Sequence, residues 1–133
     1  MRHVERRVIL ILMSMPWRSS LLKNQSFNQN NPRHGHTKEC KDAMTELFWE
    51  MKRAMAGKWK WKGGRLKITL TAYVANRNID AQNLVDAVSD ALEVALGVND
   101  KHFDISPIRK VDKENPRIEI RVEHTEHTGE TNG

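Results

Sequence analysis

The segment from Leu66 to Val74 constrains the fold more than any other part of the chain. Its apolar positions are Leu66, Ile68, Leu70, Ala72 and Val74, and Lys67, Thr69, Thr71 and Tyr73 lie between them. Successive side chains of a strand point to opposite faces, so this alternation predicts a strand with one buried and one exposed face. The elements around this strand then decide what covers its apolar face.

Three other segments are predicted as strands. The first runs from about Arg7 to Met13, and its continuous apolar run favours a strand buried on both faces. Another runs from about Phe103 to Val111, where Pro107 requires a sheet edge or a bulge. The last alternates its apolar residues Ile118, Ile120 and Val122 with charged ones.

Two helices are predicted between the strands. The first begins after Thr37, a suitable N-cap that follows a long polar stretch. It contains an apolar stripe at helical spacing and ends near Gly57. The second runs from Ala81 to about Leu96, and Gly97 stands where a C-terminal cap belongs. The order strand, helix, strand, helix, strand, strand predicts an α+β fold, a small mixed β-sheet with two helices.

The length of 133 residues fits a single domain, expected over residues 1–122. Residues 123–133 contain three glutamates and neither lysine nor arginine, and we expect them to form a disordered acidic tail. The chain has one cysteine, Cys40, which excludes an intrachain disulfide. The apolar run 8–13 is too short to span a membrane, so a cytoplasmic protein without membrane contact is expected.

Positive charge gathers just before the second helix. The formal net charge is +5, and the stretch between Lys58 and Ile79 contains six basic residues and no acidic one. The basic residues are Lys58, Lys60, Lys62, Arg65, Lys67 and Arg77. Such a stretch is typical of a surface that binds nucleic acid phosphates, although it also suits a merely soluble surface. Trp59 and Trp61 within it could stack on opened bases or pack against the first helix.

Two aspartates flank the second helix. Asp80 stands at its start and Asp100 just past its end. A carboxylate at a helix start usually caps free backbone N–H groups, and one past a helix end is usually an ordinary turn residue. Spacing alone therefore favours structural roles for both.

The residues around Asp80 nevertheless resemble a known active-site motif. The segment NIDAQNLV (78–85) is similar to the Asp-x-Asp-Asn-Leu signature that opens the active-site helix of RusA-like Holliday junction resolvases. Asp90-Ala91-Leu92, then Gly97 and Asn99-Asp100, resemble the Asp-Ala-Leu and the later acidic residues of that family. The resemblance covers residues 8 to 122.

The resemblance implies a nuclease that uses Mg²⁺, or Mn²⁺, to hydrolyse phosphodiesters of four-way or other branched DNA as a homodimer. Asp80 matches the first catalytic aspartate, Gln82 stands where the second belongs, and Asp100 matches a later one. Asp86 occupies the place of the active-site lysine. Asp80, Asp86 and Asp100 are thus the predicted metal ligands. The first strand and first helix are the candidate dimer contacts.

Two departures from the family pattern require explanation. Glutamine offers a carbonyl oxygen but no charge, so Gln82 should weaken metal binding. We expect Asp86, one helical turn after Gln82, to restore the carboxylate, and Arg77 or Lys101 to take the role of the lysine. Lys101 is therefore also predicted to bind DNA, together with the six basic residues before the second helix. Two alternatives stay open. One is a catalytically weakened or inactive protein that binds branched DNA, and the other is a small α+β interaction protein.

Overall fold

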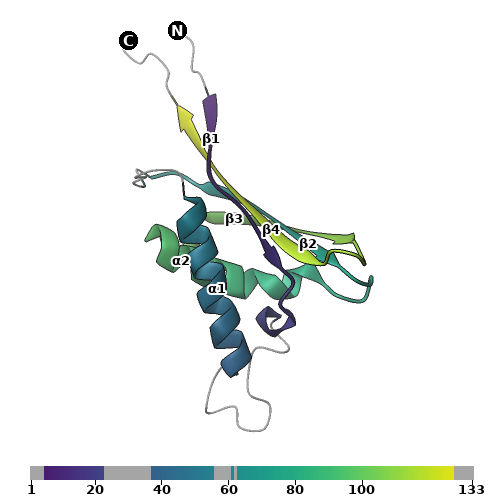
Figure 1. Ribbon diagram of the computed structural model, residues 1–133. Helices are drawn as coiled ribbons and strands as arrows, with labels where there is room; N and C mark the ends of the chain where they lie inside the picture. Colours follow the sequence, from purple (N-terminus) through teal and green to yellow (C-terminus); the bar gives the residue numbers. More distant parts are fainter. Residues whose placement is uncertain (1–4, 23–36, 56–60, 62, 128–133) are drawn as a thin grey trace, which may run out of the picture.

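A computed structural model describes residues 5–22, 37–55, 61 and 63–127 (Figure 1). One four-stranded sheet forms its centre, with the strand order β1-β4-β2-β3. The strands are β1 (Glu5–Pro16), β2 (Leu66–Val74), β3 (Phe103–Val111) and β4 (Arg117–His127). The helices are α1 (Lys38–Ala54) and α2 (Val85–Leu96), with 3-10 turns η1 (Ser19–Leu21), η3 (Ala81–Leu84) and η4 (Asp100–His102). The predicted α+β fold, with a small mixed sheet and two helices, is confirmed.

The sheet is mixed because one of its three strand pairs is parallel. β2 pairs with β3 in parallel, with Leu66 opposite Phe103 and Val74 opposite Val111. β4 pairs in the antiparallel sense with both β2 and β1. The parallel pair has to be joined by a crossover, and η3, α2 and η4 provide it. Pro107 lies on β3, which is an edge strand, in agreement with the sequence prediction.

The core lies between one face of the sheet and the two helices. The predicted apolar positions of β2 and β4 are all fully buried, and they face buried residues of the helices. These helix residues include Leu47 and Met51 of α1 and Val88 and Leu92 of α2. Thr37 is the N-cap of α1, as predicted, since its hydroxyl oxygen accepts a hydrogen bond from the Cys40 N–H at 3.1 Å. The helix ends at Ala54, and Gly57 lies outside the described residues.

The first strand differs from its prediction. β1 was expected to be buried on both faces, but Ile9 is 41% and Leu12 66% exposed. The expectation was wrong because β1 is an edge strand and the helices cover one face of the sheet only. A register shift between Ile9 and Ile11 also interrupts the alternation of buried and exposed side chains, because it leaves both Leu10 and Ile11 buried.

The last strand is longer than expected. β4 continues to His127, and its end pairs with the start of β1, where Glu5 lies opposite His127. The sequence prediction therefore placed the start of the tail too early, at Glu123, because residues 123–127 pair with the extended β1. The Glu123 side chain is buried, and its carboxylate lies 2.9 Å from Nε of Arg121. Residues 128–133 lie outside the described part of the chain.

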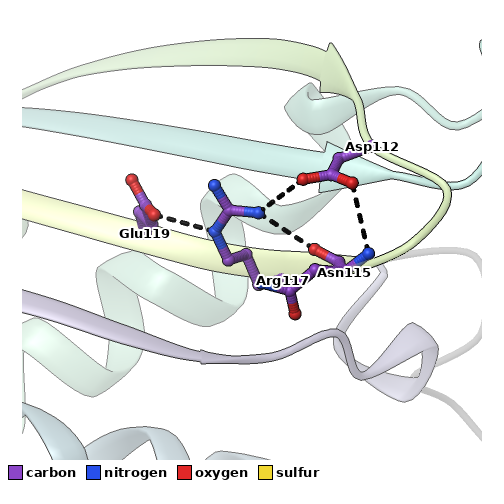
Figure 2. Close-up of polar contacts among 4 residues, drawn as sticks. All are labelled: Asp112, Asn115, Arg117 and Glu119. Atoms are coloured by element: carbon purple, nitrogen blue, oxygen red, sulfur yellow. Dashed lines mark hydrogen bonds and ion pairs between the residues drawn. The ribbon is translucent and has the colours of Figure 1, made fainter.

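An ionic network centred on Arg117 lies on the face of the sheet opposite the helices, and Figure 2 shows it. Arg117 of β4 forms ion pairs with Asp112 and Glu119, both at 2.8 Å. Its guanidinium lies 3.6 Å from the ring centroid of Tyr73 on β2. The hydrogen bond from Arg117 lowers the pKa of the Asp112 carboxyl, and the two carboxylates raise the pKa of Arg117.

Candidate functional site

Asp80 lies where the chain leaves β2 and enters the crossover. β2 ends at Val74, and a loop over residues 75–80 leads to η3. Asp80 is the N-cap of this turn, because its Oδ1 accepts a hydrogen bond from the Gln82 N–H at 3.0 Å. The carboxylate is exposed. Its capping role, the ordinary interpretation of its position, is therefore present, and one oxygen remains outside this bond.

An open hollow of about 570 Å³ adjoins Asp80. It is lined by Asp80, Ala81, Gln82, Pro107 and Arg109. Asp80 and Gln82 come from the start of the crossover, and Pro107 and Arg109 come from the edge strand β3. Nη1 of Arg109 donates hydrogen bonds to the carbonyl oxygens of Arg77 and Ile79, which ties the loop before Asp80 to β3. The hollow thus combines a carboxylate, a side-chain amide and a guanidinium.

Asp100 lies at the other end of the crossover. It begins η4, directly before β3, and its backbone N–H donates to Oε2 of Glu93 at 3.0 Å. In a strand-helix-strand unit with parallel strands, residues after the first strand and residues before the second lie at opposite ends of the sheet. The twelve residues of α2 alone span about 18 Å at 1.5 Å per residue. Within one chain, Asp80 and Asp100 are therefore not brought together.

Asp86 is exposed in the first turn of α2. The prediction that it stacks one turn after Gln82 assumed an α-helix from Ala81 onward. Residues 81–84 form a 3-10 turn instead, and α2 begins at Val85. A 3-10 turn aligns residues three apart, so the α-helical spacing applies only from Val85 onward. Asp86 does not line the hollow beside Asp80.

The donor set at the hollow does not by itself fit a magnesium ion. Mg²⁺ prefers carboxylate oxygens, and Asp80 is the one carboxylate among the described residues that line this hollow. Throughout the ranges that the structure describes, no three histidine, cysteine, aspartate or glutamate side chains gather closely enough to hold a metal. The described part of a single chain therefore does not supply the predicted ligand set.

The predicted DNA-binding residues divide between the two ends of the sheet. Arg65 and Lys101 are exposed near the amino end of the β2–β3 pair, where Nη2 of Arg65 donates to the Phe103 carbonyl at 3.4 Å. Arg77 lies at the carboxyl end, in the loop before Asp80. Lys67 stands in register between Asp104 and Glu123, an arrangement typical of cross-strand charge pairing. Lys58, Lys60 and Lys62 lie outside the described residues.

Trp61 packs at the amino end of the sheet. Its ring centroid lies 4.4 Å from that of His102, and its Nε1–H donates to the Gly64 carbonyl at 3.2 Å. The side chain is half-buried against the core. Trp61 therefore packs against His102 and the core, whereas the predicted packing of the tryptophans against the first helix stays a prediction. Trp59 lies outside the described residues.

Arg109 is the residue of the hollow that sequence reasoning missed. Its position was predicted to lie on a strand, but the neighbour of that strand was unknown. Alternation from Pro107 places Arg109 on the same face of β3, which was the available signal. The parallel pairing with β2 was needed to bring that face to Asp80.

The fold and the hollow together define a class: an α+β domain with a polar site at the carboxyl end of a parallel strand pair. The family model described as Endodeoxyribonuclease RusA matches residues 19–123, which is most of the chain. The chain therefore belongs to the RusA endodeoxyribonuclease family. No curated protein matches the chain. None of the helices in the described ranges is long and apolar enough to cross a membrane.

Proposed function

We propose that this protein is a structure-specific endodeoxyribonuclease that nicks four-way or other branched DNA in a reaction that requires Mg²⁺ or Mn²⁺. The observation that carries this proposal is the match to the RusA endodeoxyribonuclease family over residues 19–123. The position of Asp80, exposed beside a hollow that also holds Arg109, supports it. The proposal places the protein in the cytoplasm, as expected from the sequence.

We also propose that the protein acts as a homodimer. A four-way junction has approximate two-fold symmetry, and a two-fold dimer presents two identical sites to it. Exposed apolar side chains on the predicted contact elements support this proposal, since Leu12 of β1 is 66% and Trp49 of α1 is 56% exposed. The edge position of β1 supports it further, because an unpaired strand edge readily pairs with another chain.

The proposed catalytic residues remain Asp80, Gln82, Asp86 and Asp100. Since Asp80 and Asp100 lie at opposite ends of one crossover, their joint action requires that the second chain brings its Asp100 to the Asp80 of the first. Asp80→Asn and Asp100→Asn are suitable variants. Asparagine keeps an oxygen that can cap Gln82, and the hydrogen bond of Asp100 to Glu93 uses its backbone. We expect each variant alone to cut a synthetic four-way junction at least about 100-fold more slowly.

Coexpression of the two variants tests how the site is built. A mixed dimer then has one intact pair, Asp80 from one chain and Asp100 from the other, if the site is shared. Recovery of nicking would support the shared site, whereas mixed dimers as inactive as the parents would contradict it. Asp86→Asn belongs in the same series, and unchanged cleavage would refute the catalytic role of Asp86.

A second candidate function is supported by the donor set itself. Gln82 replaces a carboxylate, and the described residues of one chain do not bring three possible ligands together. These features favour a protein that binds branched DNA and does not cut it. Wild-type protein that binds a four-way junction in preference to linear duplex, but does not nick it with Mg²⁺ or Mn²⁺, would establish this alternative. Equal, salt-insensitive binding to both DNAs would overturn both candidates.

A further inference from the structure

The hollow beside Asp80 needs a cation if a DNA phosphate is to lie against its carboxylate. The two candidates from the sequence do not line it. Lys101 lies beyond the far end of α2, in η4. Arg77 lies in the loop before Asp80, where its backbone carbonyl accepts a hydrogen bond. The guanidinium that does line the hollow is that of Arg109.

The strand register directs Arg109 to this side of the sheet. Arg109 pairs with Ala72, which is buried under the helices, whereas the next residue, Lys110, pairs with Tyr73 on the opposite face. Nζ of Lys110 lies 5.9 Å from the Tyr73 ring centroid on that opposite face. Arg109 and Lys110 thus carry the same charge on adjacent residues of one strand, but they lie on opposite faces of the sheet.

The acceptors that hold Arg109 are uncharged and do not neutralise its positive charge. Nη1 donates to the carbonyl oxygens of Arg77 and Ile79, and both acceptors are neutral. By contrast, Arg18, Arg117 and Arg121 each form an ion pair with a carboxylate. A guanidinium has five N–H donors in a planar fork, so the donors on Nη2 and Nε lie outside these two contacts. An oriented fork of this kind suits the oxygens of a phosphate.

We propose that Arg109 binds a backbone phosphate of the DNA in the hollow formed with Asp80 and Gln82. Arg109 would thus supply the positive charge of the family's active-site lysine, whose place in this sequence is taken by Asp86. This inference rests on the proposed function, because the phosphate is that of the branched DNA. The two carbonyl contacts also make Arg109 a link between the bound phosphate and the loop that carries Asp80. A phosphate held there lies beside the exposed carboxylate.

The test compares Arg109→Gln with the matched control Lys110→Gln. Binding to a synthetic four-way junction is measured in EDTA at several salt concentrations, so that cleavage does not interfere. Each phosphate contact adds about 0.9 to the slope of log K against log salt concentration. We expect R109Q to reduce the steepness of this slope by about 0.9, and K110Q to leave it unchanged. With Mg²⁺, we expect R109Q to slow single-turnover nicking at least about tenfold.

Several results would overturn the inference. An R109Q slope equal to that of the wild type would refute the phosphate contact, and equal losses in R109Q and K110Q would show a diffuse charge effect. Should R109Q fail to fold, R109K decides: it keeps the charge and should keep the slope, but it should nick more slowly because an ammonium lacks the planar fork. Wild-type nicking by R109K would refute the proposed geometry. Failure of the wild type to nick would instead count against the enzyme proposal, whatever the slopes show.

Discussion

Gly97 offers the sharpest test of how the fold positions the two ends of the proposed site. It ends α2 in the left-handed region, with φ +69 and ψ 31, and its N–H donates to the Glu93 carbonyl at 2.9 Å. A Cβ added at Gly97 would have no neighbouring atom within 4 Å. Gly97→Ala therefore changes the backbone preference and creates no clash, so its cost is purely conformational.

The expected magnitude follows from the backbone alone. The left-handed conformation costs an alanine about 1–2 kcal/mol, and the reduced freedom of the unfolded chain offsets part of this by about 0.4–1 kcal/mol. A net loss of about 1 kcal/mol in the free energy of unfolding remains. With an unfolding entropy of about 2.1 cal/mol/K per residue, this loss lowers the Tm of a chain of this length by about 4 °C.

The assay is thermal unfolding followed by circular dichroism, with Gly97→Asn as the matched control. Asparagine tolerates the left-handed region better than alanine, so G97N should lose clearly less stability than G97A. An unchanged Tm for G97A would refute the reasoning, as would equal losses in both variants. Because Gly97 leads the chain to Asp100, G97A should also slow junction nicking more than G97N does.

Two further predictions concern stability. Thr37→Ala should lower the free energy of unfolding by about 1 kcal/mol in urea titrations, because it removes the cap on the Cys40 N–H. Thr37→Ser keeps a capping hydroxyl and should retain most of that stability. Equal stability of T37A and wild type would contradict the cap. Arg117 lowers the pKa of Asp112, so the stability contributed by this pair is complete above the unfolded carboxyl pKa and is lost as pH falls through the lower folded pKa. Arg117→Met should therefore show a weaker fall of Tm on acidification, and a parallel fall in both proteins would argue against it.

Local pattern determined the elements of this protein. Alternation over Leu66–Val74 placed β2 correctly, since the period of a strand depends only on neighbouring residues. Thr37 and Gly97 marked helix ends because caps act through hydrogen bonds and backbone angles within a few residues. The motif at residues 78–85 likewise indicated the family, which the match over residues 19–123 confirms.

Partners distant in the sequence were decided by the tertiary structure alone. The parallel register of β2 and β3 separates Asp80 from Asp100, and it brings Arg109 to carbonyls 30 and 32 residues earlier in the chain. The edge position of β1 exposes Leu12, although its apolar run suggested burial on both faces. Periodicity states which side of a strand is apolar, but it does not state which strand lies next to it or which face a helix covers. Those choices come from the packing of the whole chain, so the surroundings of Asp80 follow from the strand order and not from the motif.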